Sequence, residues 1–452
     1  MYKIAIKNVS NTHEYEELIK IFLRPGEFEI ADKDSGNLVF YGSDDKNRTK
    51  REIYHKLSAL TGRRPEWGII TGIRPTKLFG DIKRKKGSNS SASKAMREKY
   101  LVSDAKINLI QNIYNYQLEA FGEARKNTAG IYIGIPFCPS RCLYCAFTSN
   151  NADEEGIKKY LTALYKEINA VADMMDAKGI TAESIYIGGG TPTVLSENDL
   201  DELLALVNKR FLREETVEFT VEGGRPDTIT PGKVRSIEKN GANRISINPQ
   251  SMKDETIRLI GRNHTALEIV KAVNMTGEIS SLAINMDIIA GLPGEDVSDF
   301  SNTIDQMLDL DVENITVHSL AVKRTSRLAE KDKEYHYLYG DLVRRMIDVA
   351  ENKLGDAGYK PYYLYRQKHM SGALENVGYT KPGYSGLYNI RIMDEHQMIM
   401  ALGAGGISKA YDFDNRTLTR IPNVSNYEVY IDRIDEMIDR KRAGMFEEES
   451  KC

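Results

Sequence analysis

The sequence has no long apolar run and no segment typical of a targeting signal. A membrane helix needs roughly 18 consecutive apolar residues, and no stretch of the 452-residue sequence approaches that length. The chain starts Met-Tyr-Lys-Ile-Ala-Ile-Lys, which lacks the apolar core of a signal peptide. These absences argue against a membrane span and predict a cytoplasmic protein.

An excess of charge of either sign is also missing. The chain has 62 Lys and Arg against 65 Asp and Glu, a net charge of -3, and the two signs are interspersed. A nucleic-acid-binding protein usually carries a basic stripe or patch. The composition therefore gives no electrostatic case for nucleic acid as a partner.

Cysteine is scarce, and its placement is uneven. Only four cysteines occur, and Cys138, Cys142 and Cys145 lie within one short segment. This number and grouping do not suit a disulfide framework and indicate a reducing compartment. Residues 131–150 read IYIGIPFCPSRCLYCAFTSN, in which an apolar run predicts a buried strand and Pro136 and Pro139 predict a loop after it.

The three clustered thiolates can bind the same metal ion or metal cluster. Soft sulfur ligands favour an iron-sulfur cluster, zinc or copper(I). Zinc would need a fourth ligand, but Cys452 sits on a polar tail and no His lies near the loop. Three ligands fit a 4Fe-4S cluster with one iron open to a small molecule, and three buried thiols without a function are the alternative.

Residues 126–330 alternate short apolar runs with amphipathic helical stretches, which predicts a parallel sheet covered by helices. Six such units are too few for a complete eight-fold barrel. The expected strands are 132–137, 184–188, 217–222, 244–248, 283–290 and 315–320, and the expected helices are 155–173, 197–211, 233–240, 267–275 and 299–310.

The flanking regions predict two smaller units. Residues 1–125 form an expected α/β domain with strands at 2–6 and 38–41 and a helix at 14–22, and residues 331–452 form an expected cap over the barrel mouth. Arg74 and Lys77 follow Gly turns and could hold a carboxylate or phosphate, unless they belong to an ordinary capped turn. The basic and Ser-rich stretch 83–93 predicts a mobile loop.

Motifs with ligand-binding character follow the predicted strands. Gly188-Gly-Gly-Thr-Pro-Thr193 offers backbone to a closely approaching ligand. Glu222 ends a buried strand, where a carboxylate is costly unless it is paired, placed in a site or used as a helix cap. Gln250 and Asp287 suit ribose hydroxyls, and Arg262 suits a carboxylate, although each could equally be a cap or a surface pair.

The Cys-x3-Cys-x2-Cys spacing, with an aromatic residue before the third cysteine, resembles the radical S-adenosylmethionine (SAM) superfamily. The strand-end motifs narrow the resemblance to the oxygen-independent coproporphyrinogen III dehydrogenase group, in its form with an extra N-terminal domain. The resemblance implies a partial (β/α)6 barrel and a 4Fe-4S cluster whose open iron binds SAM. Gly223-Gly-Arg-Pro226 departs from the family, where a residue and then Asp-Pro more commonly follow the glutamate.

The resemblance also implies roles for single residues. Cys138, Cys142 and Cys145 hold the cluster, and the residues that contact SAM are Tyr132, Gly189, Gly190, Thr191, Glu222, Gln250, Arg262, Asp287, Ala321 and Ile407. Among these, Gly189, Gly190 and Thr191 belong to the segment that holds the amino group of SAM. Tyr132, Ala321 and Ile407 rest on the resemblance alone, and apolar or aromatic residues at such places are often plain core.

The implied activity is reductive cleavage of SAM to methionine and a 5'-deoxyadenosyl radical. The radical takes a hydrogen from the propionate β-carbon of coproporphyrinogen III, carbon dioxide leaves, an electron passes to an acceptor, and a vinyl group results. The family is described as holding two SAM molecules, and a low-potential donor such as flavodoxin or ferredoxin is expected.

A substrate with four carboxylates calls for cations near the mouth. Arg324, Arg366 and Lys368 are candidates, and Tyr363 and Tyr365 could stack on a pyrrole. A solvated basic face with core tyrosines is the alternative.

Relatives with nearly the same barrel act as haem chaperones or as anaerobic haem-degrading methyltransferases, and both remain alternatives. No pair of histidines stands out, because His264, His318 and His369 are isolated in the sequence and expected to be structural.

Overall fold

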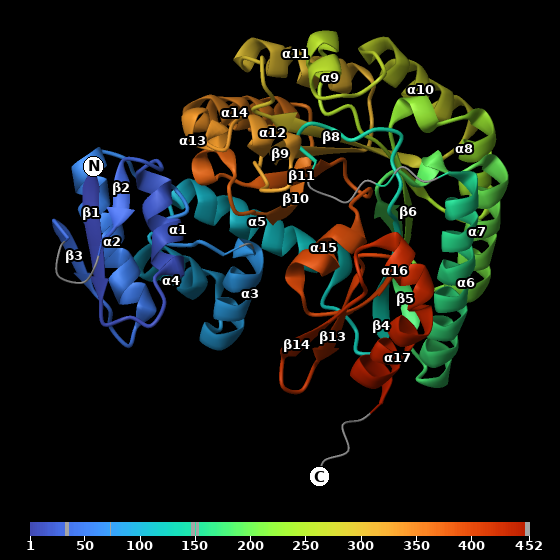
Figure 1. The fold of residues 1–452 in the computed structure, drawn as a ribbon, viewed down its shortest axis with the longest axis horizontal. Helices are drawn as coiled ribbons and strands as arrows, with labels where there is room; N and C mark the ends of the chain where they lie inside the picture. Colours follow the sequence, from blue (N-terminus) through green and yellow to red (C-terminus); the bar gives the residue numbers. More distant parts are fainter. Residues whose placement is uncertain (32–35, 73, 146–149, 151–152, 448–452) are drawn as a thin grey trace.

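The computed structural model describes residues 1–31, 36–72, 74–145, 150 and 153–447. Cys452 lies outside the described residues. Figure 1 shows a small unit formed by the N-terminal residues at one end of the molecule and a large curved sheet, lined on its outside by helices, at the other.

The N-terminal unit is built on a three-stranded parallel sheet. Its strand order is β2 (Phe28–Ile30), β1 (Tyr2–Lys7) and β3 (Leu38–Tyr41), and α1 (His13–Phe22) and α2 (Lys46–Thr61) complete it. Ile4, Leu18, Phe40 and Ile53 form its separate core. The strands and the helix predicted for this region are confirmed.

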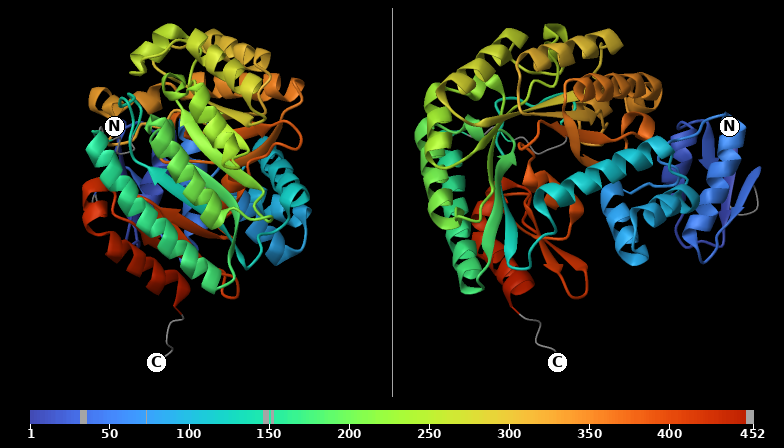
Figure 2. Two further views of the ribbon diagram at one scale, coloured as in Figure 1. Left: turned by 90° about the vertical axis from the view of Figure 1, so that its right-hand side faces the viewer. Right: turned by 180° about the vertical axis from the view of Figure 1, so that it is seen from behind.

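Three helices lead from this unit to the barrel: α3 (Pro75–Lys86), α4 (Asn89–Tyr100) and α5 (Asp104–Phe121). In the view from behind, α5 spans the gap between the two parts of the molecule (Figure 2). The mobile loop predicted for residues 83–93 is wrong. Gly87, with a φ of 85°, ends α3, and the Ser88 hydroxyl accepts a hydrogen bond of 3.1 Å from the Ser91 N–H to cap α4.

The barrel has six parallel strands, and helices follow these strands as the sequence pattern predicts. The strands are β4 (Thr128–Ile135), β5 (Thr181–Gly189), β6 (Glu218–Gly224), β7 (Arg244–Ile247), β8 (Ala283–Ala290) and β9 (Asn314–Ser319). The helices on their outer side are α6 (Glu154–Ala177), α7 (Glu197–Phe211), α8 (Pro231–Lys239), α9 (Asp254–Leu259), α10 (Ala266–Ile279), α11 (Val297–Asp309) and α14 (Gly340–Asp356). The predicted partial (β/α)6 barrel is confirmed.

The helix boundaries follow from capping side chains in the sequence. Asp153 caps α6 by accepting a hydrogen bond of 2.8 Å from the Gly156 N–H. Thr265 with Glu268, and Asp296 with Asp299, form capping boxes at the starts of α10 and α11.

The C-terminal residues extend the barrel sheet at both of its ends. The sheet has the order β10-β11-β9-β8-β7-β6-β5-β4-β12-β13-β14. The added strands are β10 (Lys360–Tyr365), β11 (Asn376–Thr380), β12 (Met398–Leu402), β13 (Ile407–Asp412) and β14 (Thr417–Pro422), with α15 (Leu387–Asp394), α16 (Tyr427–Asp432) and α17 (Ile434–Lys441). Most of this region therefore continues the sheet, and its role as a cap over the barrel mouth stays a prediction. The domain boundaries at residues 125 and 330 stay predictions.

Two short helices, α12 (Arg327–Lys331) and α13 (Tyr335–Leu338), follow β9 before α14. None of the helices in the part of the chain that the structure describes is both long and apolar enough to cross a membrane.

Candidate active site

The cysteine loop follows β4, at the edge of the sheet where the parallel strands end. Cys138, Cys142 and Cys145 are all half-buried. Burial raises the pKa of the Cys138 thiol, although a contact of 3.6 Å from the Thr191 hydroxyl opposes the shift. Thr191 follows β5, so the loop after the second strand meets the cysteine loop as the sequence motifs predict.

The three thiols of the loop could be held around one metal ion or around a cluster. Zinc gathers its ligands around one atom. A 4Fe-4S cluster binds each thiolate through a different iron, so its ligands need not converge on a point.

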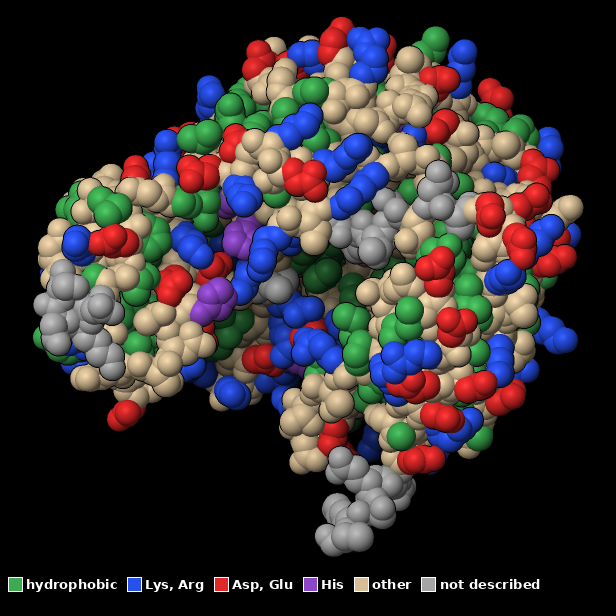
Figure 3. All heavy atoms as spheres, viewed as in Figure 1, with side chains coloured by type: hydrophobic (Ala, Val, Ile, Leu, Met, Phe, Trp, Pro, Cys, Tyr) green, Lys and Arg blue, Asp and Glu red, His purple; other side chains and the backbone are tan. Residues whose placement is uncertain are grey.

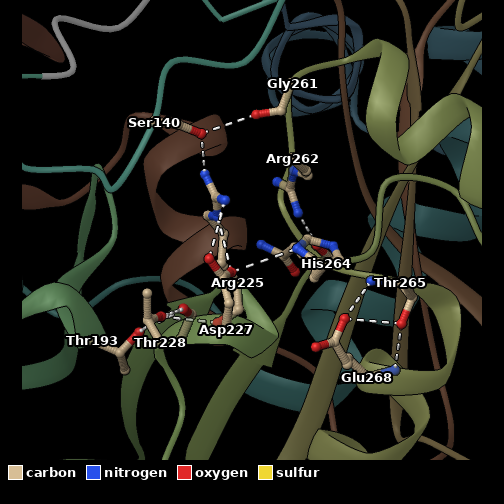
Figure 4. Close-up of polar contacts among 12 residues, drawn as sticks. Ser140, Thr193, Arg225, Asp227, Thr228, Gly261, Arg262, His264, Thr265 and Glu268 are labelled. Atoms are coloured by element: carbon tan, nitrogen blue, oxygen red, sulfur yellow. Dashed lines mark hydrogen bonds and ion pairs between the residues drawn. The ribbon is translucent and has the colours of Figure 1, made fainter.

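Arg225 anchors the cysteine loop from the end of β6, two strands away from β4 in the sheet. Its Nη1 donates a hydrogen bond of 2.7 Å to the Ser140 hydroxyl, which in turn donates to the Gly261 carbonyl at 2.9 Å (Figure 4). The same guanidinium forms two bonds of 3.1 Å to the carboxylate of Asp227. The unusual Gly-Gly-Arg-Pro sequence thus provides a buried arginine that joins two loops, a role that the sequence analysis missed.

Asp227 is held as a carboxylate by this network. Burial alone would raise its pKa, but the nearby His264 ring and the hydrogen bonds from Arg225 lower the pKa to about 2. The His264 Nδ1 lies 3.5 Å from the Asp227 carboxylate (Figure 4). His264 therefore lies against Asp227 in this network, which is a structural role of the kind expected from the sequence.

The cysteine loop and the loop after β5 lie so close together that position 190 must be glycine. A Cβ atom at this position would lie 2.4 Å from the Phe137 carbonyl oxygen and 2.9 Å from the Cys138 sulfur. The Gly190 N–H donates to the Ile135 carbonyl at 2.8 Å, and the Thr191 N–H donates to the Phe137 carbonyl at 2.8 Å. Only glycine allows the backbone to pass this close to the cysteine loop.

Glu222 faces the interior of the barrel from β6. It accepts hydrogen bonds from the Tyr186 hydroxyl and, at 3.2 Å, from the Gly189 N–H. Burial raises the pKa of Glu222 to about 7, and the negative charge of Asp287 adds to the rise. The capping alternative is wrong, because no side chain caps the short helix η2 (Pro226–Thr228) that follows.

Gln250, Arg262 and Asp287 come together through Asn248, which the sequence analysis did not single out. The Asn248 carbonyl accepts a hydrogen bond from Arg262, and its side-chain oxygen accepts one of 3.1 Å from the Asp287 N–H. The Gln250 N–H donates to the Asp287 carbonyl at 2.9 Å, with Gln250 at a φ of 66°. The three residues are therefore one connected group in the structure, and their contact with SAM stays a prediction.

Arg262 retains a free donor next to the cysteine loop. It is 7% exposed, and its Nη2 donates to the Tyr144 hydroxyl at 3.3 Å. Its Nε has no hydrogen-bond partner among the described residues. A buried donor without a partner is costly, and a ligand carboxylate would satisfy it.

A cavity of about 230 Å³ lies inside the barrel and has polar and aromatic walls. Its lining includes Tyr186, Glu222, Asp287, His318, Tyr363 and Tyr365. Burial would raise the pKa of Asp287, but the hydrogen bond from His318 lowers it below its usual value. Two carboxyl groups in one cavity thus differ in proton affinity, so that one can hold a proton while the other is ionised.

Tyr186, Tyr363 and Tyr365 line this cavity, and two further tyrosines stack on Tyr186. The rings of Tyr186 and Tyr388 stack with centroids 4.7 Å apart, and the ring of Tyr132 stacks on both. Tyr363 and Tyr365 stack on one another at 6.3 Å. Both residues line this cavity, and their stacking on a pyrrole stays a prediction.

The remaining predicted residues are more scattered. Ala321 pairs with Met370 just after β9. Ile407 lies in β13, and its side chain is 47% exposed. Within the described ranges, no hydrogen bond or ring contact joins Ile407 to the cysteine loop.

Two of the predicted substrate cations have other roles. Arg366 is buried and donates to the carbonyls of Ile70 at 2.5 Å and Ala373 at 2.6 Å, so it joins the N-terminal part of the chain to the barrel. Lys368 is exposed, with its Nζ 3.1 Å from the Nε2 of His13. Arg324 is exposed. Arg74 and Lys77 are also occupied, by Glu395 and Asp81.

Comparisons with known proteins agree with this geometry. The model of the radical SAM superfamily matches residues 132–307. The oxygen-independent coproporphyrinogen-III oxidase-like protein HemZ of Bacillus subtilis is 38% identical over 401 residues, which cover 88% of this chain and 80% of that protein. The chain belongs to the radical SAM superfamily, among the coproporphyrinogen-III oxidase-like proteins.

Two further comparisons place this radical SAM protein more closely. The haem chaperone HemW of Bacillus subtilis is 30% identical over 68% of this chain and 76% of that protein. The structure of coproporphyrinogen III oxidase (HemN) from Escherichia coli superposes with a TM-score of 0.56 at 21% identity, over 71% of this chain and 72% of that chain. The second match shows that the fold is shared.

The radical SAM domain implies a 4Fe-4S cluster and SAM, and the residues present fit both groups. Three thiols on one loop provide the ligands that leave one iron open. The backbone at Gly190 leaves no room for a side chain, and Arg262, whose Nε has no partner among the described residues, has Cys142 as a neighbour. Cys138, Cys142 and Cys145 would hold the cluster, and the glycine segment, Arg262 and Asp287 would hold SAM.

Proposed function

We propose that this protein is an oxygen-independent coproporphyrinogen III dehydrogenase-like enzyme, which oxidatively decarboxylates propionate side chains of a tetrapyrrole to vinyl groups. One observation carries the proposal: a cavity inside the barrel, lined by tyrosines, contains two carboxyl groups of different pKa and is linked to the cysteine loop. Glu222 in the cavity accepts a hydrogen bond from the Gly189 N–H, and Thr191 of the same glycine segment contacts Cys138. The identity of 38% to a coproporphyrinogen-III oxidase-like protein supports the choice of substrate class.

When bound, the cluster and SAM supply an electron and a 5'-deoxyadenosyl radical that can abstract hydrogen from an unactivated carbon. The protein's own residues position and protect the reactants. Asp287 is ionised and suits a ribose hydroxyl, and the buried Arg262 suits the carboxylate of SAM.

In this proposal, Glu222 interacts with the amino group of SAM. The Tyr186 hydroxyl and the Gly189 N–H orient its carboxyl group. With a pKa of about 7, it can shift to the ionised form when an ammonium group binds, because an opposite charge stabilises the carboxylate. The stacked rings of Tyr132, Tyr186 and Tyr388 exclude water from this region.

Each decarboxylation removes a hydrogen atom, carbon dioxide and one further electron from the substrate. The proposal therefore requires a low-potential donor, such as flavodoxin or ferredoxin, for SAM cleavage and an acceptor for the electron that the substrate gives up. Two propionates would need two molecules of SAM, bound together or in turn.

The proposal is tested by an anaerobic assay of the cluster-reconstituted protein with SAM, a reductant, an electron acceptor and coproporphyrinogen III. We expect 5'-deoxyadenosine and carbon dioxide in equal amounts, with vinyl groups in the product. A Cys142→Ala variant should lose all three products. Formation of 5'-deoxyadenosine without carbon dioxide would reject the substrate.

A haem chaperone is the second candidate, because HemW is 30% identical over 68% of this chain. A chaperone would bind haem in a fixed ratio, consume none of it and transfer it to an acceptor protein. Absorbance titration with haem, followed by extraction and recovery of the pigment, distinguishes it from the enzyme. Consumption of haem with SAM and a reductant would instead indicate haem degradation.

A further inference from the structure

A second and larger hollow lies outside the barrel, where the N-terminal unit meets the barrel sheet. This interdomain cleft has a volume of about 510 Å³. One wall comes from α1 and from residues 63–72, and the other from α13, the start of α14 and residues 366–373. In Figure 3, Lys, Arg and His side chains gather along this junction.

The cleft adjoins the catalytic edge of the sheet. β10 and β9 both run antiparallel to β11, so β10 is parallel to the barrel strands and residues 366–373 follow it at the edge where those strands end. The Val322 N–H donates to the His369 carbonyl at 3.0 Å, and Ala321 pairs with Met370. The wall of the cleft is therefore in direct contact with the segment that follows β9.

The lining of the cleft has more cations than its own carboxylates can neutralise. Its charged residues are Lys20, Arg24, Arg63, Arg64, Arg344, Arg366 and Lys368 against Glu17, Glu66 and Asp341. Two of the acids are already paired, Glu17 with Lys20 and Glu66 with Arg344.

Arg24, Arg63 and Arg64 of the N-terminal wall have no acidic partner among the described residues. Arg63 donates a hydrogen bond of 3.1 Å to the Phe22 carbonyl, which leaves Arg24 and Arg64 as the cations available to a ligand. Neither guanidinium forms an ion pair with a carboxylate of the described residues, and the buried Nε of Arg24 has no hydrogen-bond partner there. Arg64 is exposed and near the hydroxyl of Tyr54. Planar forks of this kind match carboxylate and phosphate groups.

His336 adds an independent sign of a ligand. It lines the cleft, is 6% exposed, and neither of its ring nitrogens has a hydrogen-bond partner within the described ranges. Burial lowers its pKa to about 4, so the ring is neutral at pH 7. The ring of His369 lies edge to face with it, with centroids 5.7 Å apart. Buried polar atoms are normally satisfied, so a bound molecule would supply what His336 lacks.

We propose that the interdomain cleft binds a small molecule with several carboxylate or phosphate groups, held by Arg24 and Arg64 of the N-terminal unit and by Lys368 and His336 on the barrel side. This site gives the N-terminal unit a role: it supplies the cations on one side of the catalytic edge. The proposal concerns binding only and does not depend on the reaction at the cluster.

The test is calorimetric titration of the reconstituted full-length protein with two defined probes, inorganic tripolyphosphate and coproporphyrin III. Trp67 is the only tryptophan of the chain and lies under the Arg366 guanidinium at 5.0 Å, so its emission reports on the cleft. The variant is Arg24→Gln with Arg64→Gln. Arg48→Gln, an exposed arginine of α2 that does not line the cleft, is the matched control.

We expect at least one probe to bind and to lose about tenfold or more in affinity in the double variant, since charge-assisted hydrogen bonds are removed. The Arg48→Gln control should bind like the unchanged protein. A loss for tripolyphosphate alone identifies a phosphate ligand, and a loss for coproporphyrin alone identifies a polycarboxylate. The single variant Arg64→Gln, at an exposed position, gives the same comparison if the double variant does not fold. The proposal is overturned if neither probe loses affinity relative to the control.

Discussion

The Arg225 guanidinium donates a hydrogen bond of 2.7 Å to the hydroxyl of Ser140, a residue that lies between the first two cysteines of the loop. Arg225 is 3% exposed and also holds Asp227 through two bonds of 3.1 Å. The strand end at β6 and the cysteine loop after β4 are thus fixed to one another by a single buried side chain, before any cluster is bound.

We therefore expect Arg225→Gln to lower the amount of iron-sulfur cluster that the protein binds. The change leaves the Asp227 carboxylate without its main counter-charge, at a cost of about 1–3 kcal/mol, and frees Ser140 to move. Iron and sulfide per chain after anaerobic reconstitution, together with the electron paramagnetic resonance spectrum of the reduced cluster, measure the effect. Arg235→Gln, at an exposed position on α8, should leave both unchanged. Equal iron content in the two variants would contradict the anchoring role.

Gly190→Ala is expected to displace the cysteine loop. The new methyl group would lie 2.4 Å from the Phe137 carbonyl oxygen and 2.9 Å from the Cys138 sulfur, and both neighbours belong to the loop that holds the cluster. We expect most of the iron and of the SAM binding to be lost. Gly277→Ala is the control, since a Cβ at this position of α10 meets no atom within 4 Å and the change should be neutral or stabilise the chain by about 0.5–1 kcal/mol. Normal cluster content in Gly190→Ala would show that the cysteine loop can move aside for the methyl group and still bind the cluster.

The raised pKa of Glu222 predicts a dependence of stability on pH. The folded protein holds this proton more tightly than the unfolded chain, because the pKa rises from 4.5 to about 7 on folding. Stability contributed by Glu222 is therefore present at low pH and is lost as the pH rises from 4.5 through 7, with no further loss above that range. The total is on the order of 3 kcal/mol.

Denaturant unfolding of the cluster-free protein at a series of pH values measures this change. The stability of Glu222→Gln relative to the unchanged protein should increase between pH 5 and 8 and then become constant. Glu255→Gln, at an exposed glutamate of α9, should show no such trend. A difference between Glu222→Gln and the unchanged protein that is the same at all pH values would mean that the carboxyl group is already ionised at pH 5.

The sequence predicted the barrel because its strands are buried on both faces and read as short runs of apolar residues between amphipathic helices. It predicted Cys138, Glu222 and Asp287 because thiols and carboxylates at strand ends are conspicuous. It missed Arg225 because the partner, Ser140, is 85 residues away, and local sequence carries no sign of such a pairing.

The errors have a common cause. In the sequence, Arg366 is a cation next to tyrosines. The Ile70 carbonyl to which it donates a hydrogen bond comes close only in the folded chain. The Ser-rich stretch 83–93 looked like a loop, but serine at position 88 is a helix cap. β11 pairs with β9 and β12 pairs with β4 from far along the chain, so no local pattern indicated that β10–β14 extend the barrel sheet.

Lys441 and Glu167 form an ion pair of 2.7 Å in which both side chains are 0% exposed, and this pair ties the C-terminal helix α17 to α6. Glu167 also accepts hydrogen bonds from the Tyr430 hydroxyl at 2.7 Å and from the Gly403 N–H at 2.8 Å, so it fixes the turn between β12 and β13. Removal of one partner leaves a buried charge uncompensated, which costs about 3–5 kcal/mol.

We expect Lys441→Met to lower the free energy of unfolding by about this amount, and addition of Glu167→Gln to recover part of it because the buried charge is then gone as well. Lys166→Met is the matched control, since Lys166 pairs with Asp435 at 2.6 Å across the same two helices but on the surface. Exposed pairs contribute about 0–1 kcal/mol, so the control should change little. Denaturant unfolding followed by circular dichroism measures all three variants. Similar losses for Lys441→Met and Lys166→Met would show that the buried pair contributes no more than the exposed one, and that apolar packing alone holds α17 against the barrel.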